Sequence, residues 1–199
     1  MDGESLAIKT INENFGLNIT EYATIDFSGL IHIINDIGGI EVNISKSEME
    51  YINNNVNDLY KITGNNIKKL TSYGNITLNG EQALTHSRNR TVGNDFTRAE
   101  RQREVLEAVM NKMISMGYSE IINMSDSLLK EVKTNINVWD YTGQLTDILL
   151  NTNSYCSNII SIQVPNSDYA EGDYIGGVYY FVPDTEKMKQ DMIDNIYNK

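Results

Sequence analysis

The chain has only one cysteine, Cys156, among its 199 residues. An internal disulfide needs two thiols and a cysteine-based zinc site needs several, so both are excluded. Histidine is equally scarce: His32 and His86 lie far apart in the sequence and show no metal-ligand spacing. We therefore expect both histidines to have structural roles.

Long apolar runs are also missing. No stretch approaches the roughly 18 consecutive apolar residues that a membrane-spanning helix needs. The first residues, MDGESLAIKT, lack the charged and apolar regions of a secretion signal. If the native protein is membrane-anchored, we expect the anchor to lie outside this sequence. The length suits one domain with a full core, and we predict a single domain over residues 1–199.

Positive charge is in short supply, because 16 Lys and Arg residues stand against 27 Asp and Glu residues and the net charge is −11. A surface for duplex nucleic acid makes many phosphate contacts, which this negative field would oppose. The sequence also contains no helix-turn-helix signature. We therefore expect no nucleic-acid partner, and transcriptional regulation is the weakest of the functions considered.

The few arginines are all found in one segment, Leu78 to Met116, whereas the rest of the chain uses lysine as its only cation. They are Arg88, Arg90, Arg98, Arg101 and Arg103. A guanidinium is permanently charged and presents a fork of donors that matches phosphate or carboxylate oxygens. A local cluster of this kind in an acidic chain suits one bound anion better than a long polyanion.

Within this segment, the residues from Asp95 to Gly117 have the pattern of a helix. Its predicted apolar face comprises Val105, Leu106, Val109, Met110 and Met113. Toward the N-terminus the same stripe continues through Asp95, Arg98 and Gln102. Burying such groups costs several kcal/mol unless they are paired, so we predict a polar cavity at this end. Arg101 and Arg103 flank the stripe and are predicted to lie at the surface.

Arg88 and Arg90 are two residues apart and would point to the same side if their segment is extended. They could then converge with Arg98 on the positive end of the helix, where free N–H groups favour an anion. A doubly charged ligand such as a diphosphate suits three guanidiniums better than one carboxylate does. The alternative is that the arginines are solvated, as an isolated Arg-x-Arg usually is.

Along the chain, helical and strand-like patterns alternate, which predicts an α/β layered fold. We expect helices at 3–15, 28–37, 81–86, 95–116, 119–133, 138–150 and after Asp184, strands at 22–27, 40–44, 157–164 and 178–182, and loops at 45–73 and 165–177. The first of these loops is expected to hold at most one helical turn, around residues 48–52.

The segment LNGEQALTHSRNR, followed by NDFTRAERQ, resembles the LytR-CpsA-Psr family of cell-wall enzymes. ESLAIKTINENFGLNITEYATIDFSGLIHIINDIGGIEVNI, VKTNIN and YYFVPDTEKM resemble other regions of that family, so the likeness covers nearly the whole chain. It implies a three-layer α/β/α sandwich with a mixed central sheet, N-terminally truncated relative to the family. The family's metal-binding aspartates and membrane anchor find no match in residues 1–20 and would precede Met1. A sheet edge exposed to pairing is a further expectation.

The resemblance implies a phosphotransferase at the extracellular face of the cytoplasmic membrane of a Gram-positive bacterium. Such an enzyme moves a glycopolymer, teichoic acid for example, from an undecaprenyl-pyrophosphate carrier to peptidoglycan or a similar cell-wall acceptor. The positions that grip the pyrophosphate match Arg88, Arg90, Arg98 and Gln102, and the motif's acidic residue matches Asp95. Mg²⁺ is the implied cofactor, although its ligands would lie outside this chain. The activity of the chain alone is left open.

Two further sets of residues are candidates for contacts with such a substrate. Phe27, Leu30, Ile33 and Ile34 could form a wall for the apolar carrier, although an apolar stripe at helical spacing is more often core. Tyr169, Asp173 and Tyr174 could line an acceptor groove or be solvated. The competing function is a non-catalytic binder of a polyprenyl phosphate or an anionic glycan, which turnover dependent on magnesium would rule out.

Overall fold

The computed structural model describes residues 2–59, 64, 67–91, 95–137, 140, 143, 162–166 and 168–197. Contacts divide the chain into two compact units, one of Ala23–Ile159 and one of Met1–Tyr22 with Ile160–Lys199. We describe each unit by itself, and the expectation of a single domain stays a prediction. None of the described helices combines the length and the apolar composition that crossing a bilayer requires.

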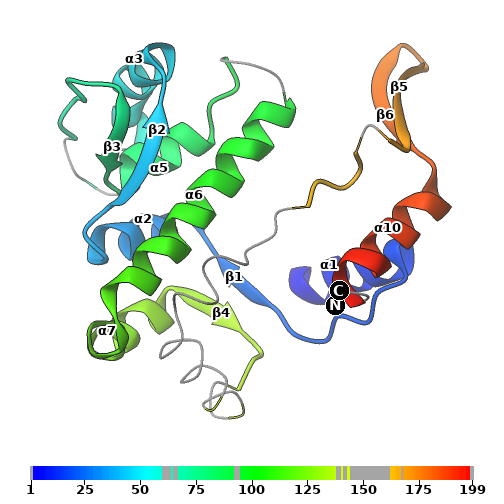
Figure 1. Cartoon of the computed structure of the whole chain (residues 1–199), viewed down its shortest axis with the longest axis horizontal. Coiled ribbons are helices and arrows are strands. Elements are labelled where there is room, and N and C mark those ends of the chain that lie inside the picture. The colour runs from blue at the N-terminus through cyan, green and yellow to red at the C-terminus, as the bar shows by residue number, and fades with distance from the viewer. Residues whose placement is uncertain are drawn as a thin grey trace. The chain divides into compact units, whose positions relative to one another are not determined.

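The larger unit carries most of the described helices (Figure 1). Its elements are β1 (Ala23–Ile25), α2 (Phe27–Asp36), β2 (Ile40–Ile44), α3 (Lys46–Asn55), the 3-10 helix η1 (Val56–Leu59), β3 (Gly74–Leu78), α5 (Gly80–Ser87), α6 (Asp95–Met116), α7 (Tyr118–Lys130) and β4 (Val132–Thr134). β1 pairs with β4 and β2 pairs with β3, and both pairs are antiparallel.

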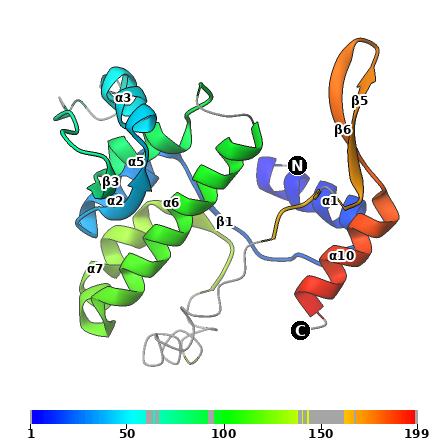
Figure 2. The same cartoon turned by 45° about the horizontal axis from the view of Figure 1, so that its top comes forward.

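The smaller unit contains α1 (Gly3–Phe15), β5 (Ala170–Ile175), β6 (Val178–Pro183) and α10 (Thr185–Tyr197). β5 and β6 form an antiparallel hairpin whose turn, Gly176-Gly177, has φ values of 61° and 82° at its two glycines. Side chains rarely tolerate positive φ, so glycine suits both turn positions. α1 contacts α10 (Figure 2).

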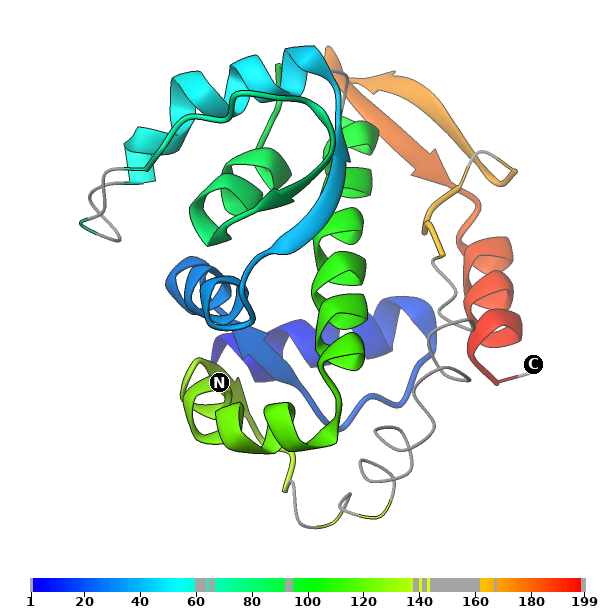
Figure 3. The same cartoon turned by 60° about the vertical axis from the view of Figure 1, so that its left-hand side comes forward.

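The α/β class predicted from the sequence is confirmed. The described strands form three separate two-stranded antiparallel sheets and not one mixed sheet. Helices contact strands of the two sheets in the larger unit, at β2, β3 and β4. α6, for example, runs alongside β2 (Figure 3).

The prediction that residues 45–73 form a loop with one helical turn is wrong, because α3 spans ten residues and η1 continues it. A capping box begins the helix: the Glu48 N–H donates to the Ser45 hydroxyl at 3.3 Å, and the Ser45 N–H donates to the Glu48 carboxylate at 2.9 Å. Ile52 then anchors the helix in the core, where it is fully buried. The sequence of α3 has few apolar residues, so its helical periodicity was not recognised.

The strand expected at 22–27 is shorter, and Phe27 begins α2. Asp26 caps this helix, because its Oδ1 accepts the N–H of Gly29 at 2.7 Å. The helix expected at 119–133 ends at Lys130 and β4 follows it.

In the smaller unit, β5 occupies part of the loop expected at 165–177. Most of the helix expected at 138–150, and residues 157–161 of the expected strand, lie outside the described residues. The last residues of that strand, 162–164, are described and are not in a strand.

The core of the larger unit is built from isoleucine, valine and leucine side chains of α2, β2, α3, β3, α6 and α7. Along β2 the even positions Ile40, Val42 and Ile44 are buried and the odd positions are exposed, the alternation of a strand with one covered face. α6 contributes Val105 and Val109.

The apolar face predicted for α6 is partly wrong, because Leu106 and Met110 are 52% and 47% exposed. Its buried positions are Arg101, Val105 and Val109, which follow each other at i, i+4 spacing. The stripe is therefore rotated, and toward the N-terminus it leads to Arg101.

All eight residues of α5 are buried, although most are polar or glycine. Several of their polar groups are hydrogen-bonded to neighbouring elements. The Asn35 amide accepts the Gly80 N–H at 2.8 Å and donates to Glu81 at 3.2 Å, and the Gln82 amide donates to the Lys68 carbonyl at 3.0 Å. These bonds fix α5 against α2 and the chain before β3, so the position at which α5 delivers Arg88 is set.

We predict that Gly80→Ala destabilises the protein by about 3 kcal/mol, the upper end of the usual cost of overpacking. A Cβ at Gly80 would meet the Ile31 carbonyl oxygen and lie 2.7 Å from the Ile31 Cα, both backbone atoms that cannot rotate away. Urea unfolding measures the change. Gly3→Ala is the control, because a Cβ there meets nothing within 4 Å. Equal unfolding midpoints for both variants would contradict the prediction.

Candidate anion-binding site

A cavity of about 530 Å³ opens between α2, α3, the end of α5 and the start of α6. We call it the arginine cavity, and it is lined by Phe27, Tyr51, Asn55, Thr85, Arg88, Arg90, Arg98 and Gln102. The four side chains that the sequence predicted to share a polar cavity are all in this set. Their convergence is therefore observed, whereas their role in binding pyrophosphate stays a prediction.

Helical spacing explains two sides of the arginine cavity. Arg98 and Gln102 are four residues apart on α6, and Tyr51 and Asn55 are four apart on α3, so each pair shares one face of its helix. The Asn55 amide also donates to the Tyr51 carbonyl at 2.7 Å, an i, i+4 bond within α3.

We had considered an extended segment at Arg88 and Arg90, but the chain after α5 is not extended at Arg88. Arg88 is the C-cap of α5 with helical backbone angles, φ −90° and ψ −2°, and its N–H donates to the Leu84 carbonyl at 3.2 Å. Asn89 is fully buried, whereas Arg88 and Arg90 on either side of it are exposed. The two guanidiniums therefore reach the cavity because the residue between them points inward.

Phe27 and Arg88 contact each other at the edge of the arginine cavity. The Arg88 Cζ lies 5.2 Å from the centroid of the Phe27 ring, within the range of a cation–π interaction. The ring is 53% exposed, so it offers the guanidinium a face without removing it from solvent. This contact restricts the position of Arg88 and leaves its N–H donors available.

The electrostatics of the arginine cavity are opposite to those of the chain. Three guanidiniums line it, and no carboxylate is among the described residues that do so, while the chain carries a net charge of −11. Arginine is always protonated and cannot act as a base. The described lining can therefore bind an anion and neutralise charge that develops on it, and it contains no carboxylate or imidazole that would accept a proton.

Asp95 is the first residue of α6, as predicted. Its side chain lies outside the described part of the structure. Its expected role as the acidic residue of the motif stays a prediction.

The candidates for a lipid-binding wall are separated. Phe27 lines the arginine cavity, but Ile33 and Ile34 are 8% and 0% exposed and belong to the core, and Leu30 packs against them. The alternative that this stripe is core therefore holds for α2 beyond its first turn.

The prediction for Arg101, which lies on α6 next to Gln102 of the cavity lining, is wrong. Arg101 was expected at the surface, but it is 8% exposed. Its Nε donates to the Glu48 carboxylate at 2.7 Å, and its Nη1 donates to the Asn89 carbonyl at 3.2 Å. The signal that could have found it was its position four residues before Val105, but the partner helix α3 had not been recognised.

Glu48 is ionised more readily than an ordinary glutamate. Burial opposes its ionisation, but hydrogen bonds from the Arg101 guanidinium and from Ser45 outweigh this effect and lower the pKa of the carboxyl. The pair lies with side-chain exposures of 9% for Arg101 and 14% for Glu48, so solvent screens it little.

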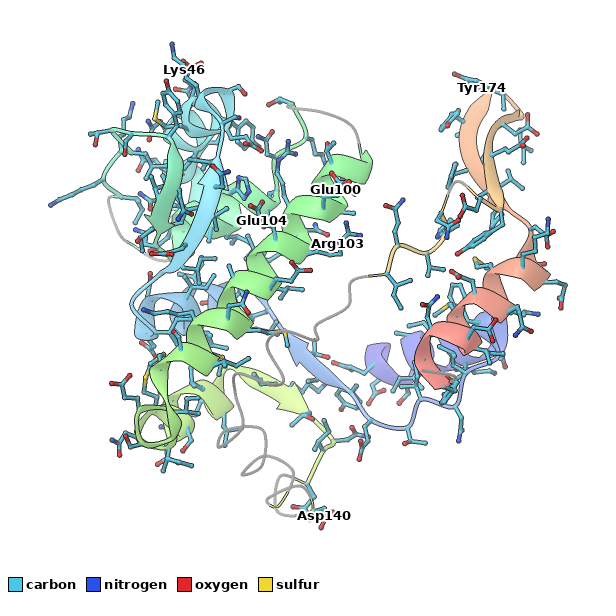
Figure 4. All side chains as sticks on the ribbon, viewed as in Figure 1. Lys46, Glu100, Arg103, Glu104, Asp140 and Tyr174 are labelled. Carbon is cyan, nitrogen blue, oxygen red and sulfur yellow. The ribbon has the colours of Figure 1, made fainter. Side chains whose placement is uncertain are left out.

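The two histidines make the structural contacts that were expected of them. His32 lies 3.1 Å from the Glu131 carboxylate at the surface. His86 is buried in α5, and its Nε2 lies 3.3 Å from the Glu104 carboxylate of α6. Figure 4 shows Glu104 and Arg103 leaving α6 on different sides.

The candidates for an acceptor groove all lie in the smaller unit. Tyr169 and Asp173 line a second cavity of about 540 Å³, and the exposed Tyr174 is in β5. The Tyr169 hydroxyl donates to the Asp191 carboxylate at 3.0 Å. A role in binding an acceptor stays a prediction for these residues.

The described lining of the arginine cavity does not by itself provide the ligands of a magnesium site. Mg²⁺ is usually held by one or two carboxylates together with substrate oxygens. No group of three Asp, Glu, His or Cys side chains that could hold a metal occurs in the described part of the chain. The described lining of the arginine cavity adds no carboxylate to a bound anion.

We predict that Glu48→Gln lowers the free energy of unfolding at pH 7 by about 2 kcal/mol, because a charge-assisted hydrogen bond to a buried guanidinium is lost. A lowered pKa in the folded state stabilises the fold above the ordinary glutamate value of about 4.3 and loses that effect as pH falls through the folded value. The difference between the wild-type and variant stabilities should therefore begin to shrink as pH falls below about 4.3 and should disappear only below the lower folded-state pKa of Glu48. Urea unfolding at pH 7 and in this acid range measures both, and a constant difference would contradict the assignment.

Comparisons with known proteins agree on one family. The family model LytR_cpsA_psr matches residues 1–195. The polyisoprenyl-teichoic acid–peptidoglycan teichoic acid transferase TagU of Bacillus mycoides is 30% identical over 190 residues, which are 93% of this chain and 55% of that protein. The chain thus spans a little over half the length of the curated relatives it matches.

Solved structures show the same fold. The structure of TagT bound to LIIa-WTA superposes with a TM-score of 0.67 at 23% identity, covering 98% of this chain and 68% of that one. A protein of Streptococcus agalactiae gives a TM-score of 0.70 at 24% identity, covering 99% of this chain and 63% of its own. Since the family model covers all but the last four residues, the chain belongs to the LytR-CpsA-Psr family.

Proposed function

We propose that the arginine cavity binds the pyrophosphate of a polyisoprenyl-pyrophosphate-linked glycan, and that the complete protein transfers this glycan to peptidoglycan or a similar cell-wall acceptor. The observation that carries the proposal is the convergence of Arg88, Arg90, Arg98 and Gln102 on one cavity in an acidic chain. Guanidiniums bind phosphate oxygens with paired hydrogen bonds, and three of them more than neutralise the two negative charges of a doubly esterified diphosphate.

The relatives support this substrate class. The curated relatives are named as enzymes that move teichoic acid from a polyisoprenyl carrier to peptidoglycan. TagT, which shares the fold, has been solved bound to LIIa-WTA. A substrate of this kind would place the protein at the outer face of the cytoplasmic membrane in a Gram-positive cell envelope.

The proposed reaction is a phosphoryl transfer. An acceptor hydroxyl oxygen bonds to the glycan-side phosphorus, and the bond from that phosphorus to the bridging oxygen breaks. The products are the glycan joined to the acceptor through a phosphodiester, the polyisoprenyl phosphate and one proton. Negative charge builds on the leaving phosphate, and positioned guanidiniums stabilise such charge without reorganising. Arg88, Arg90 and Arg98 would supply this stabilisation.

A second candidate is a chain that binds the carrier without turning it over. The described lining of the arginine cavity has guanidiniums for a phosphate but no carboxylate for Mg²⁺, an arrangement that suits binding alone.

We predict that inorganic pyrophosphate binds the chain and that Arg88→Ala and Arg98→Ala each weaken binding by about 1–3 kcal/mol, the range for hydrogen bonds to charged groups. Calorimetric titration measures the affinity. Arg103→Ala is the control, since Arg103 is on the same helix but is not among the residues that line the cavity. Equal losses in all three variants would point to a general field effect and would count against the site.

Turnover separates the two candidate functions. The chain is mixed with a polyprenyl-pyrophosphate-linked glycan and an acceptor, with and without magnesium, and polyprenyl phosphate release is followed. Release that depends on magnesium and on Arg98 supports the transferase. Tight binding of the lipid with no release supports the binder.

A further inference from the structure

We propose that Arg101 is a positioning residue that sets the distances between the arginines lining the arginine cavity. Through these distances, Arg101 determines how strongly the cavity prefers a diphosphate to a single phosphate. This inference rests on the proposed function, since it deepens the account of the same cavity. Arg101 does not line the cavity and is 8% exposed, so its action is indirect.

Arg101 joins the elements that form three sides of the arginine cavity. It belongs to α6, one residue before Gln102 and three after Arg98. Its Nε donates to Glu48 of α3 at 2.7 Å, and α3 carries Tyr51 and Asn55.

The third connection reaches the segment between the two exposed arginines. The Arg101 Nη1 donates at 3.2 Å to the carbonyl oxygen of Asn89, which stands between Arg88 and Arg90. Asn89 is fully buried, and its Oδ1 accepts from the Thr91 N–H at 3.0 Å and from the Thr91 hydroxyl at 3.1 Å. The segment from Arg88 to Thr91 is thus fixed by hydrogen bonds at the buried Asn89, and this fixes the positions of Arg88 and Arg90 on either side.

Only a guanidinium can make this connection. A planar fork donates in two directions at once, whereas a lysine ammonium is a compact charge on a flexible stem. Lysine at this position could keep the ion pair with Glu48 and lose the bond to Asn89. Arg101→Lys therefore separates the charge of Arg101 from its geometry.

A diphosphate needs cations at a fixed spacing, whereas a single phosphate is satisfied by any two of them. Loosening the segment around Asn89 should therefore weaken diphosphate binding more than phosphate binding. A residue that only stabilised the fold would lower the thermal midpoint and leave the ratio of the two affinities unchanged.

The test compares the wild-type chain with Arg101→Lys, Glu48→Gln and the control Arg103→Lys, with inorganic pyrophosphate and inorganic phosphate as probes. We expect Arg101→Lys to raise the pyrophosphate Kd about tenfold and the phosphate Kd at most about twofold, because geometry and not charge is lost. Arg103→Lys should change neither. An unchanged ratio in a folded Arg101→Lys protein overturns the proposal.

A second readout needs no ligand. Hydrogen exchange is followed at the amides of Arg88, Asn89 and Thr91, all of which are hydrogen-bonded, with the amides of β2 as the internal reference. We expect exchange at these three amides to become about tenfold faster in Arg101→Lys while β2 is unchanged, the pattern of local opening. Equal exchange, or equal acceleration everywhere, overturns the proposal.

The two readouts keep the outcomes distinct. A wild-type chain that does not prefer pyrophosphate contradicts the proposed function, and the exchange experiment then still decides whether Arg101 holds the segment. If Arg101→Lys fails to fold, Glu48→Gln keeps the side-chain shape and weakens the same connection. Its pyrophosphate-to-phosphate ratio should shift in the same direction, and no shift overturns the proposal.

Discussion

The buried ion pair of Arg101 and Glu48 is the interaction on which the rest of the larger unit's cavity depends. Removing two charges from water is expensive, and such a pair survives only with close geometry and further hydrogen bonds. Both are present, since Ser45 donates to Glu48 and Asn89 accepts from Arg101. An apolar pair of similar volume would fill the same space, but it could not hold α3, α6 and the segment after α5 in one register.

The arginines divide into two kinds that the sequence does not distinguish. Arg101 is hydrogen-bonded inside the protein, whereas Arg88 and Arg90 are exposed and line the cavity. One guanidinium with internal partners therefore supports others that are available for a ligand. This division explains how an acidic chain can concentrate positive charge at one place: fixed internal acceptors order the segment, and the ligand would supply the remaining acceptors.

The sequence was a good guide where local pattern and tertiary contacts agree. Glycines at element ends, capping residues and the spacing of apolar residues predicted α1, β2, α5, α6 and β6 closely. The clustering of all arginines in one segment, together with their spacing, predicted the four polar residues that meet in the cavity. It failed where burial depends on a partner far along the chain. α3 has few apolar residues and depends on a capping box and Ile52, and Arg101 is buried only because α3 brings Glu48 to it. In the hairpin, only Ala170 of β5 is buried and no residue of β6 is. β5 therefore lacks the alternation of buried and exposed residues by which a strand is recognised in a sequence.

The close approach of Gly80 to the backbone of Ile31 has a consequence for how a bulky lipid-linked ligand could enter. Because the backbones of α2 and α5 approach closely at this point, sliding of one helix along the other is sterically opposed. Phe27 begins the first helix and Arg88 ends the second, and their cation–π contact joins the same two helices at another point. A lipid-linked ligand would therefore meet α2 and α5 as a closely packed side of the arginine cavity.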